Sequence, residues 1–173
     1  MKIESPAFTL DDVHAFMDVY LDRERQILAD RLEDASRRLA ELAPRITKQR
    51  AEADEWTAHE VLAHIAVLSK YYGVLVHRVA SGQMSDLNIM EAVNARDPAG
   101  ERMAELDPEQ LLAMTLSDHR RTVDELRAAD VASLRRSARL DDERRMSAEE
   151  IARLPLISHL EGHIEQLQRM LDR

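Results

Sequence analysis

Two histidines near the C-terminal end, His159 and His163, have a spacing that suits a metal site. On a helix, residues four apart lie on the same face with about 6 Å between their side chains, so both imidazoles can reach one ion. The chain contains seven histidines, and a pair at this spacing also arises by chance. The spacing therefore permits a shared metal ion without requiring one.

A third histidine, His64, lies on the apolar face of another predicted helix, beside Val61 and Leu68. His159 and His163 border a similar apolar face, so we expect all three imidazoles to point towards the core. A buried imidazole without a partner is costly, and one divalent ion would satisfy three of them together. The alternative is a set of core histidines satisfied by ordinary hydrogen bonds.

The other four histidines have weaker claims to a metal. His119 lies on the apolar face of a third predicted helix, where we favour a satisfied core histidine over a fourth ligand or a partner of a ligand. His14, His59 and His77 lie near predicted helix ends, where we expect surface or boundary positions.

The amino-acid composition limits which metal ligands, nucleophiles and binding partners the protein can use. The chain has no cysteine, so a metal site must use His, Asp or Glu, and the protein supplies no thiol nucleophile of its own. A net charge of −9 argues against nucleic-acid binding. No run approaches the roughly 18 apolar residues of a membrane span, and the first residues resemble no signal region, so we expect a cytoplasmic protein.

The fold predicted from this composition is all-α. Only four Gly and five Pro occur among 173 residues, and strong helix formers dominate, which suits a single domain over residues 1–173. Helix-start signals, in which a capping side chain precedes an acid or amide by three residues, occur four times. They are Thr9 with Asp12, Thr57 with Glu60, Asp107 with Gln110 (and Pro108 at the first helical position), and Ser147 with Glu150.

Apolar residues recur after each start at helical spacing, which predicts four packed helices. The expected buried residues are Val13, Met17, Tyr20, Ile27, Leu32, Leu39 and Leu42; Val61, Ile65, Leu68, Tyr72, Leu75 and Val79; Leu112, Leu116, Val123 and Leu126; and Ile157, Leu160, Ile164, Leu167 and Leu171. We expect Pro155 to kink or restart the last helix. The segment 81–106 is too long for a turn and should cross over the bundle, with a short helix capped in Ser85–Asn88.

Two segments carry a family resemblance: Trp56-Thr57-Ala58-His59-Glu60-Val61-Leu62-Ala63-His64-Ile65, and Ser158-His159-Leu160-Glu161-Gly162-His163-Ile164-Glu165-Gln166-Leu167. Together they resemble the DinB/YfiT-like superfamily, whose pattern is matched at His64, His159, His163 and Gln166. The resemblance implies a four-helix bundle in up-down-down-up order, with a long crossover between helices 2 and 3, and often a homodimer.

The resemblance also implies one divalent ion, zinc or nickel, bound by His64, His159 and His163. Some relatives are thiol transferases or isomerases that use a low-molecular-weight thiol such as mycothiol, bacillithiol or glutathione. We therefore expect a thiol transferase, or a hydrolase that activates water. The alternative is a non-enzymatic metal-binding or stress-response bundle.

No catalytic residue is singled out by spacing. Glu60, Glu161 and Tyr71 are candidate proton carriers, but we interpret them as a capping residue, a solvated charge and a core aromatic. A cluster of arginines before the last helix could receive an anionic cosubstrate, although a solvated charged loop is the favoured interpretation. These arginines are Arg135, Arg136, Arg139, Arg144 and Arg145.

Overall fold

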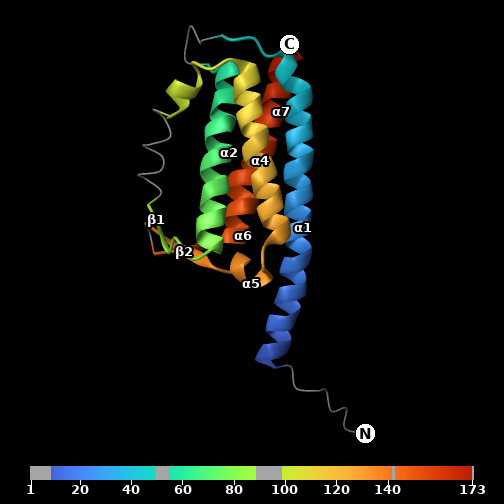
Figure 1. Ribbon diagram of the computed structural model, residues 1–173, viewed down its shortest axis with the longest axis vertical. Helices are drawn as coiled ribbons and strands as arrows, with labels where there is room; N and C mark the ends of the chain where they lie inside the picture. The colour runs from blue at the N-terminus through green and yellow to red at the C-terminus, as the bar shows by residue number, and fades with distance from the viewer. Residues whose placement is uncertain (1–8, 50–54, 89–98, 142, 173) are drawn as a thin grey trace.

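The computed structural model describes residues 9–49, 55–88, 99–141 and 143–172, and most of them are helical (Figure 1). The all-α prediction is confirmed, with the addition of a small sheet. The elements are α1 (Leu10–Leu42), η1 (Ala43–Arg45), α2 (Ala58–Ala80), β1 (Asp86–Leu87), α4 (Pro108–Ala128), α5 (Val131–Leu134), β2 (Ser137–Leu140), β3 (Arg145–Ser147), α6 (Ala148–Ile151), η2 (Ala152–Ser158) and α7 (His159–Leu171).

The long helices pack around one apolar core. Helix α4 lies against α1 and α2, and the continuous segment α6–η2–α7 lies against the same two helices (Figure 1). Leucine and isoleucine side chains from every long helix meet in this core and are fully buried. They include Leu28, Leu32, Leu39, Leu62, Ile65, Leu111, Leu126, Ile157, Ile164 and Leu167. Within the described residues, no helix is both long and apolar enough to cross a bilayer.

Each of the four predicted helix starts is confirmed. Thr57 precedes α2 and its hydroxyl accepts the Glu60 N–H at 3.2 Å, while the Glu60 carboxylate accepts the Thr57 N–H at 2.8 Å. The same reciprocal box occurs before α1 and α6, and Pro108 opens α4. These hydrogen bonds span three residues, so local sequence is sufficient to place them.

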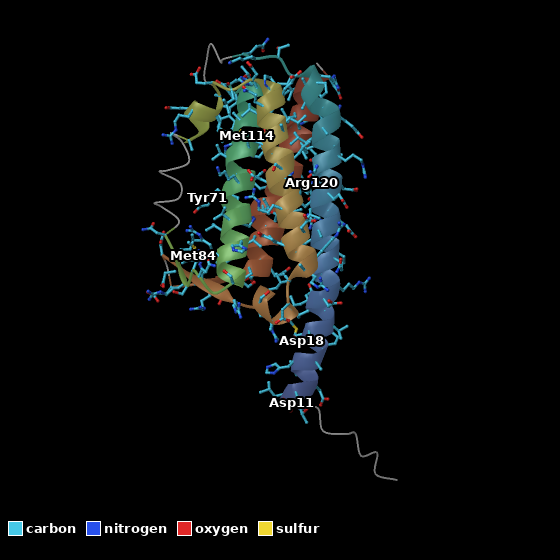
Figure 2. All side chains as sticks on the ribbon, in the orientation of Figure 1. Asp11, Asp18, Tyr71, Met84, Met114 and Arg120 are labelled. Atoms are coloured by element: carbon cyan, nitrogen blue, oxygen red, sulfur yellow. The ribbon has the colours of Figure 1, made fainter. Side chains whose placement is uncertain are left out.

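The first part of α1 departs from the predicted core. Val13, Met17, Tyr20 and Ile27 were expected to be buried, yet each is exposed. Figure 2 shows the reason, since the turns that carry Asp11 and Asp18 project beyond the other helices. From Leu28 onwards the helix is covered by its neighbours, and there the predicted apolar face is buried.

The charged segment before the last helix forms a sheet and not a loop. Strands β2 and β3 pair antiparallel with Ala138 opposite Met146, and β1 pairs parallel with β2. The predicted helix at Ser85–Asn88 is therefore wrong over Asp86 and Leu87, because their backbone pairs with the hairpin. The rest of that expected helix, which was to end before Pro98, lies outside the described residues. Residues 99–103, after it, are helical.

The arginines of this segment are used within the protein. Arg135 pairs with Asp18 at 2.9 Å, and Arg139 pairs with Asp86 at 2.8 Å. Arg145 donates to the hydroxyl and carbonyl oxygens of Ser137. The expected solvated loop is therefore wrong for these three arginines, and their contacts within the protein argue against an anion site.

Helix α2 packs tightly against α4 at Gly73. A Cβ atom built on Gly73 would lie 2.6 Å from Thr122 Oγ1, which is too short for any contact. We predict that Gly73→Ala lowers the free energy of unfolding by about 1–2 kcal/mol, because overpacking outweighs the better helix propensity of alanine. Urea unfolding followed by circular dichroism measures this change.

The Thr122→Ala variant provides the matched background. It removes the hydroxyl that the new methyl group would strike, so Gly73→Ala introduced there should stabilise the protein by roughly 0.5–1 kcal/mol. Equal effects of Gly73→Ala in the two backgrounds would contradict this packing argument.

Candidate functional site

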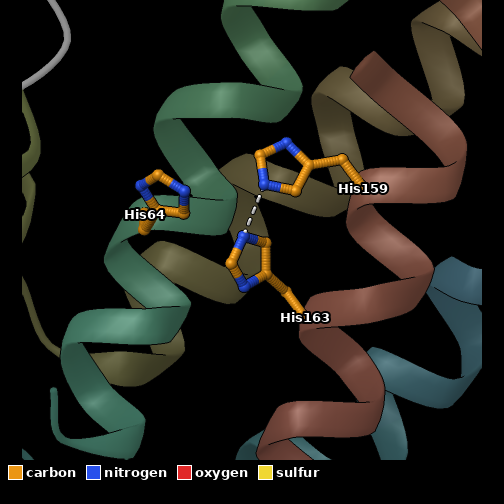
Figure 3. A group of neighbouring side chains, drawn as sticks. All are labelled: His64, His159 and His163. Atoms are coloured by element: carbon orange, nitrogen blue, oxygen red, sulfur yellow. Dashed lines mark hydrogen bonds between the residues drawn. The ribbon is translucent and has the colours of Figure 1, made fainter. Parts of the chain in front are cut away.

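Three histidines from two helices face one another at one side of the bundle. Figure 3 shows His64 on α2 opposite His159 and His163 on α7. The ring centroid of His64 lies 5.8 Å from that of His159 and 4.8 Å from that of His163. One nitrogen atom of each ring lies within 4.8 Å of the others, and all three side chains are half-buried. This arrangement could hold a metal ion.

Helix α2 places His64 through its well-defined start. The capping box at Thr57 fixes where the helix begins, and His64 follows within two turns. Trp56 precedes the cap and contacts His64 edge-on, with ring centroids 4.8 Å apart. The indole is nevertheless 48% exposed. Trp56 therefore contacts the His64 ring at the protein surface and does not belong to the core.

Helix α7 places His159 and His163 one turn apart, as their spacing predicts. The Nε2 atoms of the two rings are 2.9 Å apart, so one ring donates a hydrogen bond to the other (Figure 3). These two imidazole nitrogens, together with one from His64, form a group of three nitrogen atoms that could bind one metal ion.

A π-helical turn leads into this pair. Pro155 was expected to kink or restart the helix; it does not restart it, but lies inside η2, a π-helix that joins α6 to α7. In an α-helix, residues four apart drift by about 40° around the axis, so a row at that spacing soon leaves the core. The wider π turn reduces this drift. It keeps Ala152, Leu156, Leu160 and Ile164 buried in one row, with His159 and His163 beside it.

Neighbouring side chains orient α7 and one of its histidines. Gln166 Oε1 accepts a hydrogen bond from His163 Nδ1 at 2.9 Å, which leaves Nε2 of that ring with its lone pair. Arg31 on α1 holds Glu161 through two hydrogen bonds, 3.0 Å from Nε and 2.6 Å from Nη2. Glu161 was expected to be a solvated charge, but this fork half-buries it and ties α7 to α1.

The bundle is closed behind the histidines. A cavity of about 10 Å³ is enclosed there by His163, Ser69 and apolar residues of α2 and η2. This space is at most that of a single water molecule. This cavity is therefore too small to hold a ligand larger than water.

His119 is a satisfied core histidine and is not part of the three-histidine group. Ser36 donates its hydroxyl to the Leu32 carbonyl, so it accepts from His119 Nδ1 at 2.8 Å. On the other side, Ser69 donates to His119 Nε2 at 2.7 Å. Burial lowers the pKa of His119 to about 4, so the ring is neutral in the folded protein at neutral pH.

The remaining histidines divide between surface and interior. His14 and His77 are exposed, as expected, and His77 lies 3.4 Å from Glu125. The expectation for His59 was wrong, since it is 1% exposed and lies between the carbonyl oxygens of Gln49 and Leu106. Two chain connections close over the start of α2 at this point, which the sequence around His59 does not reveal.

Sequence reasoning missed the partners of Glu161 and of His119. Arg31, Ser36 and Ser69 carried no recognisable signal, because each meets its histidine or glutamate partner through tertiary packing. The capping interpretation of Glu60 is confirmed. Tyr71 packs its ring edge-on against Tyr72 at 5.2 Å.

Comparison with known proteins identifies the family. The family model for the mycothiol maleylpyruvate isomerase N-terminal domain matches residues 28–156, which is more than half of the chain. The match includes His64 and ends before His159 and His163. No curated protein matches the chain significantly, and no solved structure does so. The chain therefore belongs to the mycothiol maleylpyruvate isomerase N-terminal domain family, which is a DinB/YfiT-like family.

Proposed function

We propose that this protein is a metal-dependent enzyme that activates a small thiol for transfer to an electrophilic substrate. In this proposal one divalent ion, Zn²⁺ or Ni²⁺, is held by His64, His159 and His163. The observation that carries the proposal is the convergence of three imidazole nitrogens within 4.8 Å of one another from two different helices. Membership of a DinB-like family, in which metal binding is typical, supports it.

The residues present fit such an ion. Imidazole is a good ligand for zinc and nickel, and three protein ligands leave a position open for a reactant. The hydrogen bond from His163 Nδ1 to Gln166 is the kind of contact that fixes the ring orientation of a metal-bound histidine. The fork between Arg31 and Glu161 holds α7 in place, so both of its histidines are positioned before an ion arrives.

A divalent ion on three neutral imidazoles supplies Lewis acidity, which lowers the pKa of a thiol or water beside it towards neutrality. Because the chain contains no cysteine, the sulfur must come from a cosubstrate. The family name points to mycothiol, and we infer a low-molecular-weight thiol of this type. Trp56 supplies an exposed aromatic wall on the accessible side of His64.

The proposal extends to the assembly and location of the protein. We infer a cytoplasmic homodimer whose helices follow the up-down-down-up order, with residues 1–173 as one domain. The path of the ribbon in Figure 1 supports this order, because α2 and α4 both start at the end of the bundle where α1 finishes. No residue is assigned a role in proton transfer.

The single tryptophan offers a direct test of the metal site. Trp56 is the sole tryptophan of the chain and contacts His64, so Ni²⁺ bound there should quench its fluorescence. We expect quenching to saturate at one ion per chain and to reverse with a chelator. His163→Ala should remove this response, whereas His14→Ala, an exposed histidine outside the group, should retain it.

Activity is tested separately on the metal-loaded protein. Conjugation of mycothiol, bacillithiol or glutathione to a quinone or an epoxide should be faster with the protein than without it, and His163→Ala should remove the acceleration. Stoichiometric metal binding with no acceleration by any thiol would refute thiol transfer. It would leave hydrolysis by activated water, or a non-enzymatic metal-binding bundle, as the function to examine.

A further inference from the structure

A cavity lies where helices α2 and α4 end side by side, at the other end of the bundle from the histidine group. Figure 1 shows both helices ending beside α5. The cavity, which we call the helix-end cavity, is lined from segments 76–81, 125–130 and 133–136. Its volume is about 370 Å³, which is within the range of small-molecule pockets. Val76 follows His64 by about 18 Å along α2, so this cavity is separate from the proposed metal site.

The lining of the helix-end cavity combines an apolar surface with a few charged groups. Val76, Leu126 and Leu134 come from three different helices, line the cavity and are buried. Glu125, Asp130 and Arg136 line it as well. A pocket of this composition suits a ligand that has a hydrocarbon body and a charged group, because the apolar lining covers the body and the charged side chains orient it.

Two carboxylates of this lining have no permanent cation as a partner. Glu125 is half-buried, and its one printed neighbour is His77 at 3.4 Å, a side chain that is charged only when it is protonated. Asp130 caps α5 by accepting the Ala132 N–H, and it forms no ion pair within the part of the chain that the structure describes. The α4 side of the cavity therefore carries unbalanced negative charge.

The C-terminal end of α4 adds to this negative potential. The last carbonyl groups of a helix form the negative end of its dipole, which favours a cation nearby. At the ends of α1 and α2 the N–H of the cap residue bonds back into the helix, but Ala129, the cap of α4, is extended and makes no such bond within the described residues. Arg127 pairs with Asp30 and Glu33 on α1, and neither it nor Arg25, which donates to its carbonyl, lines the cavity.

The arginine that does line the cavity is already engaged with α2. Arg136 donates from its guanidinium to the carbonyl of Ala80, the last residue of α2. This contact places a cation at the end of α2, and the structure gives it no ion pair with Glu125 or Asp130. The two helix ends therefore differ, because α2 has its own cation and α4 has none in the cavity.

We propose that the helix-end cavity binds a small organic cation, in which an ammonium group is attached to an apolar body. The ammonium group lies against Glu125 and Asp130 at the end of α4, where hydrogen bonds from N–H to a carboxylate are the strong, charge-assisted kind. The apolar body covers the buried side chains of the lining and is removed from water. An anion of the same size would face two carboxylates and a helix C-terminus, which disfavours its binding.

Glu125 is the carboxylate on which the proposal depends most. It also lines a neighbouring cavity of about 230 Å³ between α2 and α4, together with His77. The contact between Glu125 and His77 therefore lies where the two cavities adjoin, and the carboxylate is accessible from the helix-end cavity while half-buried. A partly buried carboxylate interacts more strongly with a cation than a fully solvated one, because less water screens the pair.

The test compares three probes of one shape in nuclear magnetic resonance titrations of the full-length chain. Phenethylamine is the cation, 2-phenylethanol its neutral counterpart and phenylacetate the anion. Phenethylamine should produce saturable shifts of the amide signals of segments 76–81 and 125–136, with a dissociation constant about 10-fold or more below that of 2-phenylethanol. Equal dissociation constants for these two probes, tighter binding of phenylacetate, or no saturable shift in these segments would overturn the proposal.

Paired variants separate a specific site from general attraction to a protein of net charge −9. Glu125→Gln combined with Asp130→Asn keeps the size of both side chains, and asparagine still caps α5, so the fold is retained. This variant should bind phenethylamine about 10-fold or more weakly and 2-phenylethanol as before. Asp124→Asn removes an exposed carboxylate of α4 that does not line the cavity and should bind phenethylamine like the wild type.

An equal loss of phenethylamine binding in Asp124→Asn would show attraction to the overall charge and reject the site. His163→Ala should bind phenethylamine like the wild type, because the helix-end cavity lies at the other end of the bundle. The proposal therefore does not rest on the proposed function, and each is tested without the other.

Discussion

Replacing His64 with alanine is expected to abolish stoichiometric binding of Zn²⁺ or Ni²⁺ while the helical bundle stays folded. His64 is the sole member of the three-histidine group on α2, and the other two lie one turn apart on α7. Its loss leaves a two-histidine pair, which holds a divalent ion weakly. The affinity should fall by more than the roughly 10- to 100-fold typical for loss of a residue that only orients a ligand.

Gln166→Ala provides the matched comparison. It removes the acceptor from His163 Nδ1 but leaves three imidazoles, so the affinity should fall by about 10- to 100-fold and one ion per chain should still bind at saturation. Elemental analysis after dialysis and isothermal titration calorimetry measure both variants, and circular dichroism checks the fold. Wild-type metal content in His64→Ala would reject the proposed ligand set.

The metal-free protein should lose stability on acidification through the buried His119. Its pKa is lowered to about 4 by burial, against 6.5 for an unburied histidine, so the unfolded chain binds a proton at a pH where the folded protein does not. Stability therefore rises with pH across this window and is fully present above about pH 6.5. A difference of this size corresponds to a loss on the order of 3 kcal/mol between pH 6.5 and pH 4.

The His119→Asn variant isolates this effect. Asparagine does not titrate. The free energy of unfolding of the variant, measured in urea, should therefore fall by about 3 kcal/mol less than that of the wild type between pH 6.5 and pH 4. The variant should also be less stable at neutral pH, since it cannot bond to both Ser36 and Ser69.

Ser69→Ala is the control for the lost hydrogen bond. It is also expected to be destabilised at neutral pH, but it keeps the buried imidazole and hence the steep response to acid. Parallel pH curves for the wild type and His119→Asn would show that His119 does not carry the acid sensitivity.

The predictable part of the fold is the part that depends on residues close in sequence. Capping boxes join residues three apart, and the His159–His163 pair joins residues four apart, so both follow once a helix is assumed. The short sheet was not predicted, because its strands are brief and charged and β1 is paired by a distant hairpin. Too many residues of α1 were predicted to be buried. The periodicity of apolar residues shows which face of a helix is apolar, but it does not show how far the neighbouring helices extend along it.

The amino-acid sequence alone determined the all-α class, the starts of the long helices, the absence of cysteine chemistry and the two histidines on one face of the last helix. Tertiary structure decided that His64 meets His159 and His163, that Arg31 holds Glu161, that His119 is buried between two serines, and that the first turns of α1 are exposed. The physical reason is the distance along the sequence over which each kind of interaction acts. Backbone hydrogen bonds and caps act within one helical turn, whereas side chains far apart in sequence meet only when the packing of whole helices brings them together.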